Sequence, residues 1–199
     1  MVFDLGNVLI GWDPRNLYRK LFDGRDEEME HFLANVCTGA WNVEQDRGRS
    51  FGDGVASLLP QHPEALHALI RAYDERWHEM LSGEFSETVA ILEKLHRERT
   101  PLYALTNWNQ DKFLHARELC PCLSLFDGIV VSGEEGVIKP DAAIYRTLLQ
   151  RYKLDASDCV FIDDSLSNVN GARAVGMHAL HFQSPSELSI ELRRLGFVV

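Results

Sequence analysis

Six residues whose side chains could act together on a phosphorylated compound lie at or just beyond the ends of short apolar runs. They are Asp4, Thr106, Asn107, Lys139, Asp163 and Asp164. Carboxylates that lie close together repel one another and raise each other's pKa unless a cation lies between them. Oxygen ligands without a Cys or His cluster favour Mg²⁺, which proteins usually hold with one or two carboxylates, water and phosphate oxygens. These residue types therefore predict a Mg²⁺ site that acts on a phosphorylated substrate.

Asp4 is the candidate nucleophile of this site. A carboxylate facing the ion can attack phosphorus and form an aspartyl-phosphate, which divides one difficult displacement into two easier steps. Thr106 is expected to hold phosphate oxygens, and Lys139 with the ion makes the site locally positive. The whole chain carries a formal net charge of −10. That charge disfavours nucleic acid and anionic membrane surfaces as partners, because both require a basic footprint.

Such a site requires strands that end at a common edge, and the chain contains five runs that fit. They cover residues 2–7, 101–107, 128–132, 159–163 and 178–182. Each is rich in apolar residues without polar alternation, as expected for strands buried on both faces. Helical patterns lie at 109–119, 141–152, 166–175 and 185–195. The alternation predicts an α/β fold with a doubly wound parallel sheet, in which ligands bind outside the carboxyl ends of the strands.

The segment between the first two strands has a different pattern. It contains no convincing strand, whereas residues 26–37 have a helical pattern and the apolar positions between 66 and 81 fall on one helical stripe. A further helix at 86–98 leads back into the sheet. We therefore predict a helical cap of residues 15–82 inserted into an α/β core of residues 1–14 and 83–199.

The tryptophans indicate the walls of the substrate cleft, and the cysteines indicate the cellular compartment. Trp12 and Trp108 adjoin catalytic residues and are expected to wall the substrate cleft, whereas Trp77 lies on the apolar helical stripe and is expected in the core. Trp41 and the loop 44–47 are candidates for reading the substrate. Four cysteines without a CxxC pair, and no visible secretory signal or bilayer-spanning run, predict a cytoplasmic protein, monomeric or homodimeric.

Four ordered signatures in this sequence resemble those of the haloacid dehalogenase-like (HAD) hydrolases. They are FDLGNV, ALTN, IKPD and FIDDSLSN, and the resemblance that they carry extends over essentially the whole chain. The resemblance is to the branch with a helical cap after the first motif, of the FDLGNV type that includes sugar-1-phosphate phosphatases. It implies a Rossmann-like core and a phosphatase that hydrolyses a small phosphorylated metabolite, such as a sugar phosphate, through an aspartyl-phosphate.

The resemblance also assigns a role to each motif residue. It implies that Asp4 is the nucleophile, that Thr106 and Asn107 contact the phosphate, and that Lys139 balances the charge between the nucleophile and the phosphate. It further implies that Mg²⁺ is held by Asp164, Asp163, Asp4 and the Gly6 carbonyl. Asn168 either joins the site or only braces its loop.

Gly6 is a departure from the usual family pattern. Most phosphatases of the family carry a second Asp there, which protonates the leaving oxygen and later activates water. Asp13 or a substrate hydroxyl is the first candidate to replace that acid. Dehalogenases of the family also lack it, so a 2-haloacid dehalogenase is an alternative function. A catalytically silent member that binds a phosphorylated ligand or a partner protein is another.

Overall fold

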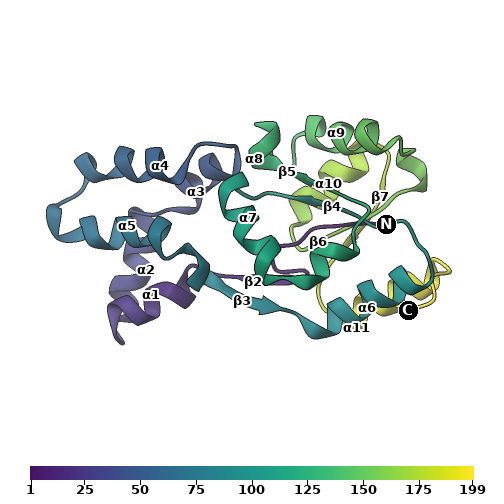
Figure 1. Cartoon of the computed structure of the whole chain (residues 1–199), viewed down its shortest axis with the longest axis horizontal. Helices are drawn as coiled ribbons and strands as arrows, with labels where there is room; N and C mark the ends of the chain where they lie inside the picture. The colour runs from purple at the N-terminus through teal and green to yellow at the C-terminus, as the bar shows by residue number, and fades with distance from the viewer.

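The computed structural model describes all 199 residues and confirms the α/β fold, with one five-stranded parallel sheet (Figure 1). The strands are β1 (Val2–Phe3), β4 (Tyr103–Thr106), β5 (Gly128–Val131), β6 (Val160–Asp163) and β7 (His178–His181), in the order β5-β4-β1-β6-β7. β1 is shorter than the predicted 2–7, because the carbonyl of Leu5 accepts hydrogen bonds from Leu9 and Ile10 in a turn. Asn7 adopts a φ of 55° in the same turn.

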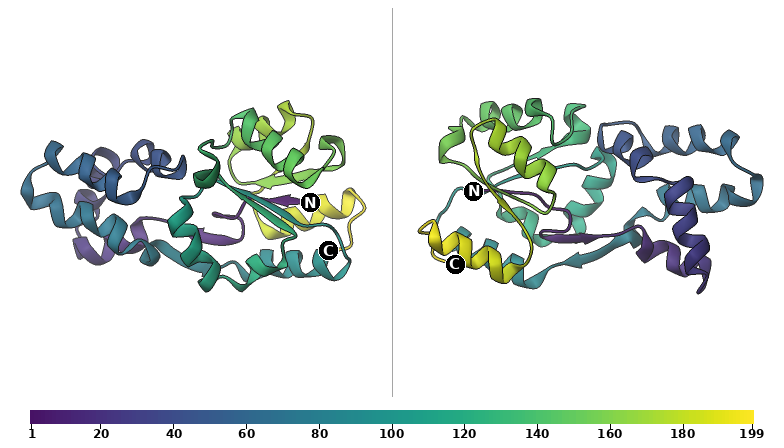
Figure 2. Two further views of the ribbon diagram at one scale, coloured as in Figure 1. Left: turned by 45° about the horizontal axis from the view of Figure 1, so that its top comes forward. Right: turned by 180° about the vertical axis from the view of Figure 1, so that it is seen from behind.

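Helices cover both faces of the sheet (Figure 2). α9 (Ala142–Tyr152) and α10 (Leu166–Ala174) pack on one face with Val2, Leu105 and Phe161. α6 (Ser86–Arg97), α7 (Gln110–Leu119) and α11 (Pro185–Arg194) contribute to the core cluster that contains Phe3, Ala104 and Ile162. Neighbouring residues on each strand are therefore buried against different helices, which explains why the runs do not alternate with polar residues.

A second group of helices forms the cap at one end of the molecule (Figure 1). It contains α1 (Arg15–Phe22), α2 (Asp26–Asn35), α3 (Gly39–Asp46), α4 (Phe51–Leu58) and α5 (His67–Glu75). Aromatic side chains fill its interior, with ring centroids 5.0 Å apart both for Tyr18 with Phe32 and for Trp41 with Tyr73. The apolar stripe between 66 and 81 is not one helix: α5 ends at Glu75 and a 3₁₀ turn, η3 (Trp77–Met80), follows.

The cap is joined to the sheet by a short antiparallel ribbon that the sequence did not predict. It consists of β2 (Ile10–Trp12) and β3 (Leu81–Glu84). A Cβ on Gly11 would lie 2.0 Å from the Ser82 hydroxyl oxygen, so a larger residue there would displace the Ser82 side chain. The expected boundary at 82/83 falls inside β3. The ribbon thus belongs to both the cap and the core, and the exact boundary between these two parts stays a prediction.

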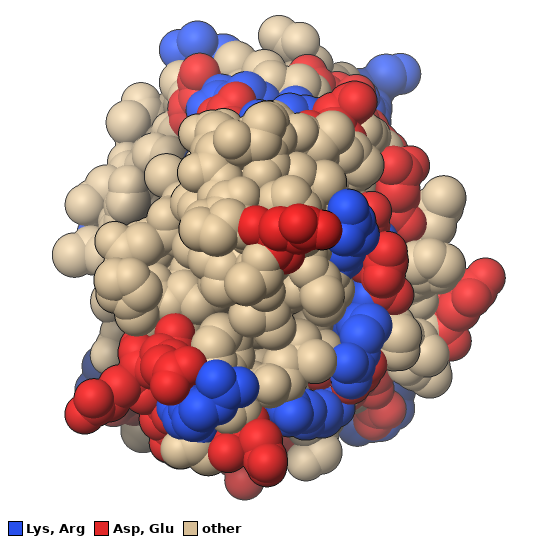
Figure 3. All heavy atoms as spheres, turned by 90° about the vertical axis from the view of Figure 1, so that its left-hand side faces the viewer, with Lys and Arg blue, Asp and Glu red and all other residues tan.

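Figure 3 views the molecule from the cap end. Acidic and basic side chains lie interleaved around the rim of this face, and most of its middle consists of uncharged residues. This end of the molecule therefore shows no extended patch of one charge. None of the helices has both the length and the apolar character that crossing a membrane would demand.

Candidate active site

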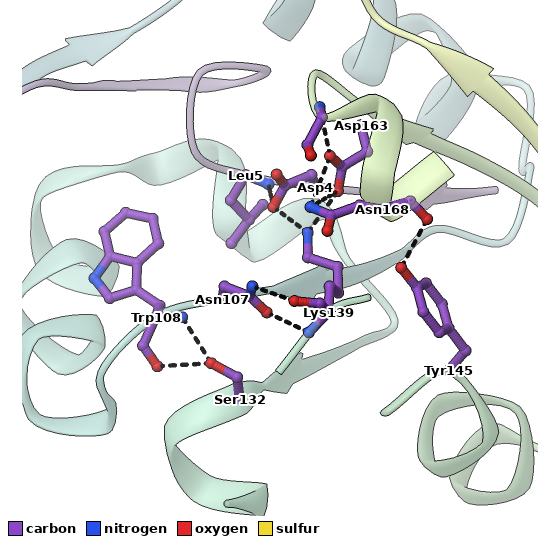
Figure 4. A network of polar contacts seen from close by, with 10 residues as sticks. Asp4, Leu5, Asn107, Trp108, Ser132, Lys139, Tyr145, Asp163 and Asn168 are labelled. Carbon is purple, nitrogen blue, oxygen red and sulfur yellow. Dashed lines mark hydrogen bonds and ion pairs between the residues drawn. The ribbon is translucent and has the colours of Figure 1, made fainter. Parts of the chain in front are cut away.

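Four of the predicted residues, Asp4, Asn107, Lys139 and Asp163, meet beside the central strand of the sheet (Figure 4). β1 and β6 are neighbours, and the chain leaves them towards different sides: β1 leads to β4 and β6 to β7. Open α/β sheets bind ligands at such a switch point, outside the carboxyl ends of the strands. Asp4 directly follows β1, and its amide donates to the carbonyl of Ile162 at 2.8 Å, so it lies next to Asp163, the last residue of β6.

Lys139 lies between the two aspartates. Its ammonium nitrogen is 2.8 Å from Asp4 Oδ1 and 2.7 Å from Asp163 Oδ2, and its side chain is almost completely buried. Asp163 Oδ1 also accepts from the Ser165 amide at 2.8 Å, and both its oxygens accept from Asn168 Nδ2, at 3.0 and 3.2 Å. Asp163 is therefore fully engaged within the protein, and Asn168 braces it.

The site's burial controls its electrostatics. Burial raises the pKa of Asp4 to about 7, and the negative charges of Asp163 and Asp164 add to this, while Lys139 opposes it. Burial alone would lower the pKa of Lys139, but Asp4 and Asp163 hold it above its ordinary value. Burial and the charge of Asp163 also raise the pKa of Asp164. The buried ammonium therefore stays charged, and the carboxylates compete for it.

The donor set fits a hard divalent cation. One carboxylate oxygen from each of Asp4, Asp163 and Asp164 lies within 4.8 Å of the others. Asp4 Oδ1 accepts from the Leu5 amide at 2.7 Å and pairs with Lys139, whereas Asp4 Oδ2 and the Asp164 carboxylate accept no hydrogen bond from another residue. Three carboxylates and one ammonium carry a formal charge of −2, which a divalent ion would neutralise.

The two residues of the ALTN motif differ in their surroundings. Thr106 is 1 % exposed, and its hydroxyl has no hydrogen-bond partner within the chain. Asn107, by contrast, makes two hydrogen bonds to the main chain of Lys139: Nδ2 donates to its carbonyl at 3.0 Å and Oδ1 accepts from its amide at 2.8 Å. Asn107 therefore positions Lys139, and its contact with phosphate stays a prediction.

A small cleft opens from Gly6 and Asn107 towards the cap, with a cavity volume of about 80 Å³. It is lined by Gly6, Trp12, Asn42, Asp46, Phe51, Trp77, Asn107, Trp108 and Asn109. The cavity is small, so a bound metabolite would extend beyond it unless the cap moves. The indole nitrogens of Trp12 and Trp108 are buried without a partner. Unpaired buried donors are costly, so these two are suited to a ligand or water.

Three of the four tryptophans line the cleft. Trp12 and Trp108 do so as expected, and Trp77, whose ring centroid is 5.7 Å from that of Trp108, lines it while also lying in the core cluster where it was expected. Trp41 does not line the cleft, and its indole nitrogen donates to the Gly54 carbonyl at 3.1 Å inside the cap. The helical stripe did not indicate that Trp77 would also face the cleft, because α5 ends at Glu75 and a 3₁₀ turn begins at Trp77.

Four hydrogen bonds, which we call the clasp, lie where the end of α3 meets the core: three join the cap to the core, and one orients Ser132 within the core. The Ser132 hydroxyl donates to the Asp46 carbonyl at 2.5 Å and accepts from the Trp108 amide at 2.9 Å. Asn109 Nδ2 donates to the carbonyls of Gln45 and Arg49, both at 3.1 Å. The sequence analysis missed Ser132 and Asn109, because a hydrogen bond between distant segments leaves no local pattern.

Two curated fungal proteins are similar to this chain over nearly its whole length. The sesquiterpene phosphatase astK of Aspergillus oryzae is 37% identical over 194 residues, covering 98% of this chain and 94% of that protein. The drimenol cyclase drtB of Aspergillus calidoustus is 27% identical over 203 residues, covering 98% of this chain. The chain spans only 36% of that cyclase.

Solved structures share the fold. A HAD family enzyme of Bacteroides thetaiotaomicron, solved as a magnesium complex, superposes with a TM-score of 0.74 at 21% identity, covering 96% of each chain. A dehalogenase superposes with a TM-score of 0.66 at 19% identity, covering 96% of this chain and 95% of that one. The family model described as haloacid dehalogenase-like hydrolase matches residues 42–182. With that match and the 37% identical relative, this chain belongs to the haloacid dehalogenase-like hydrolases.

Proposed function

We propose that this protein is a Mg²⁺-dependent phosphatase that hydrolyses a small phosphorylated metabolite through an aspartyl-phosphate on Asp4. The observation that carries the proposal is the cluster of the buried residues Asp4, Lys139 and Asp163 with the exposed Asp164. Its lysine is paired with two carboxylates, while Asp4 Oδ2 and Asp164 remain free of protein donors. A phosphatase relative at 37% identity supports the reaction class.

Each residue of the cluster has a separate role in the proposed reaction. Asp4 is the nucleophile: an oxygen of its carboxylate forms a bond to phosphorus as the ester bond to the leaving oxygen breaks. Lys139 offsets the negative charge of Asp4 and of the incoming phosphate, and Asp163 and Asn107 hold it in place. The ion would be held by Asp4, Asp164 and the Gly6 carbonyl. When bound, it would supply charge neutralisation and orientation for the phosphate.

Two substrate classes fit different features of the cleft. The unpaired indole N–H groups of Trp12 and Trp108 suit the hydroxyls of a sugar phosphate, the class implied by the FDLGNV resemblance. The aromatic surface formed by these residues with Phe51 and Trp77 suits a hydrocarbon, such as the isoprenoid part of a terpenoid phosphate. The name of the sesquiterpene phosphatase relative favours the second class.

Phosphate release tests the proposed reaction. Wild-type protein and Asp4→Asn are assayed with 4-nitrophenyl phosphate, glucose 1-phosphate and farnesyl monophosphate, in Mg²⁺ and in EDTA. We expect turnover in wild type with Mg²⁺ but not in EDTA or in Asp4→Asn, and a hydroxylamine-labile phosphate on the peptide that contains Asp4, detected by mass spectrometry. Asp23→Asn is the matched control, because Asp23 is exposed and its φ of 47° is one that asparagine also adopts. Near-wild-type turnover by Asp4→Asn would contradict the mechanism.

The same panel separates the substrate classes and the alternative functions. A kcat/KM for farnesyl monophosphate above that for glucose 1-phosphate would support the isoprenoid class, and the reverse order would support a sugar. Chloride release from 2-chloropropionate without phosphate release would instead identify a dehalogenase. No turnover with any of these compounds would favour a silent, ligand-binding member.

A further inference from the structure

The core carries no carboxyl group at the usual position of the proton donor. Asp13, the first candidate to replace it, does not line the cleft, and its Oδ1 accepts from the Arg15 amide at 2.8 Å. Gly6 occupies the position two residues after the nucleophile, and a Cβ built there would meet no atom within 4 Å. No neighbouring side chain has moved into this space, so the core leaves it open. General acid catalysis typically contributes about 10²–10⁴-fold to a rate, so a phosphatase acting on poor leaving groups needs a donor from elsewhere.

Asp46 lines the same cleft as Gly6 but belongs to the cap, whereas Gly6 belongs to the core. It is the last residue of α3 in the cap. Its Oδ2 accepts from Asn42 Nδ2 at 3.1 Å, whereas its Oδ1 accepts no hydrogen bond from the protein. Its main-chain carbonyl is held by the Ser132 hydroxyl at 2.5 Å. The clasp therefore fixes this carboxyl group over the catalytic edge of the sheet, with one oxygen available to a ligand.

The surroundings of Asp46 favour its protonated form. Neighbouring Arg47 pairs with Glu44 at 3.8 Å, and the guanidinium of Arg49 is taken up by two acceptors within α3, so neither neutralises Asp46. A negative charge at the C-terminal end of a helix is also disfavoured by the helix dipole. Burial, with a smaller contribution from the charge of Asp4, raises the pKa of Asp46 to about 7. A carboxyl group in this state can both give and take a proton near neutral pH.

We propose that Asp46, on the cap, is the general acid and base that replaces the missing side chain at Gly6. The inference rests on the proposed phosphatase function. In the first step, Asp4 bonds to phosphorus, the phosphorus–oxygen ester bond breaks, and the Asp46 proton passes to the leaving oxygen, which departs as an alcohol. In the second step, the Asp46 carboxylate takes a proton from water, the water oxygen bonds to phosphorus, and Asp4 is released with inorganic phosphate.

The test compares leaving groups. Asp46→Asn and wild type are assayed with 4-nitrophenyl phosphate, whose leaving group needs little protonation, and with a simple alkyl phosphate. We expect Asp46→Asn to lose about 10²–10⁴-fold in kcat/KM for the alkyl ester and much less for the aryl ester. Glu27→Gln, an exposed acid on α2 of the cap that does not line the cleft, is the matched control and should match wild type with both esters.

A second variant tests the role by restoring an acid in the usual place. Gly6→Asp has room for its side chain, because no atom lies within 4 Å of the new Cβ. In the Asp46→Asn background, Gly6→Asp should recover part of the alkyl phosphatase activity. Gly6→Asn in the same background places an amide of the same shape there and should recover none, which separates proton transfer from a change in shape.

The pH dependence of kcat/KM distinguishes proton transfer by Asp46 from a purely structural role, which would leave that dependence unchanged. Asp4 beyond β1 and Tyr73 on α5 interact with Asp46 through charge. The helices packed against α3 carry Asp53 on α4 and Glu134 and Glu135 on α8 (Ser132–Glu135), and Arg49 follows α3. For the alkyl ester, kcat/KM of wild type should fall above about pH 7, because an ionised Asp46 cannot donate. Asp46→Asn should lack this alkaline decline.

Three results would overturn the inference. Asp46→Asn could keep its alkyl activity, or lose activity equally on both esters, which would indicate a role in cap closure only. An alkaline decline that persists in Asp46→Asn would assign the proton to another group. Failure of the phosphatase proposal is distinct, because wild type itself would then hydrolyse neither ester, and the inference would fall with it.

Discussion

Asp163 and Asp164 are neighbours in sequence with the same side chain, yet the structure gives them different partners. Asp163 is fully buried and receives Lys139, Asn168 and the Ser165 amide, whereas Asp164 is exposed and receives no side-chain donor. The first is suited to holding the lysine, and the second to holding an ion. Both remain candidate metal ligands, but their substitution should have different effects.

We expect Asp163→Ala to lower the free energy of unfolding by about 3–5 kcal/mol, because it leaves the buried ammonium of Lys139 with one partner fewer. Asp164→Ala should leave stability nearly unchanged and raise the Mg²⁺ concentration that gives half-maximal activity. Urea unfolding and a metal titration of phosphate release measure the two effects. An Asp164→Ala variant with an unchanged metal titration would remove Asp164 from the ion site.

The raised pKa of Asp46 also predicts an effect on stability. Its value of about 7 in the folded protein exceeds the ordinary 3.8. Between these values the folded state binds more protons than the unfolded state, so this group makes stability fall as the pH rises. Asp46→Asn should therefore be more stable than wild type by an amount that grows from pH 4 to pH 8, reaching about 1–4 kcal/mol. Urea unfolding of both proteins across this range measures the difference between their free energies of unfolding. The contributions of the other carboxylates are common to both proteins and cancel in this difference.

At the scale of elements, the cap and the core approach one another closely at two glycines, Gly48 and Gly133. Gly48 has a φ of +110°, and a Cβ built on it would lie 2.9 Å from the Gly133 carbonyl oxygen on α8. Gly48→Ala should therefore strain the backbone by about 1–2 kcal/mol and hold the end of α3 away from the core. We expect a higher KM and a lower kcat, measured with 4-nitrophenyl phosphate.

Gly52→Ala is the matched control for this substitution. Gly52 lies within α4, where the nearest atom to a new Cβ is the Ser50 hydroxyl oxygen at 3.9 Å. The alanine should stabilise the helix by about 0.5–1 kcal/mol and leave both kinetic constants unchanged. Equal kinetics for Gly48→Ala and wild type would show that this contact does not control closure.

The elements also show what a sequence can and cannot predict. The five strands of the sheet were predictable, because residues such as Val2 and Phe3 are buried on opposite faces and produce an apolar run without alternation. The ribbon was not, because β2 has three residues with Gly11 in the middle, and so short a pairing depends on the bodies that it joins. Likewise, the place of Lys139 in the site was predictable from its motif, whereas the place of Asp46 depends on how the cap docks on the core.

At the scale of the whole molecule, the ion and the fold should stabilise one another. A ligand that binds only the folded state adds about 2.7 kcal/mol at a hundred times its dissociation constant. Mg²⁺ would also relieve the repulsion among Asp4, Asp163 and Asp164. We expect the Tm of wild type to rise in millimolar Mg²⁺ and to return in EDTA, measured by thermal unfolding. Asp164→Ala should show a smaller rise, and an equal rise in both proteins would place the ion elsewhere.

The two-stranded ribbon and the clasp lie on opposite sides of the junction between the cap and the core (Figure 1). Paired strands resist sliding along their length more than they resist twisting, so the cap is expected to rotate about β2 and β3 rather than translate. Trp12 ends β2 and lies near the axis of that rotation, whereas Asp46 lies on the side that travels farthest. When the cap opens, Trp12 should therefore stay in place and offer a preformed aromatic surface to the substrate. A bound substrate would keep its organic end on this surface while the proton donor arrives last, which makes each turnover wait for closure.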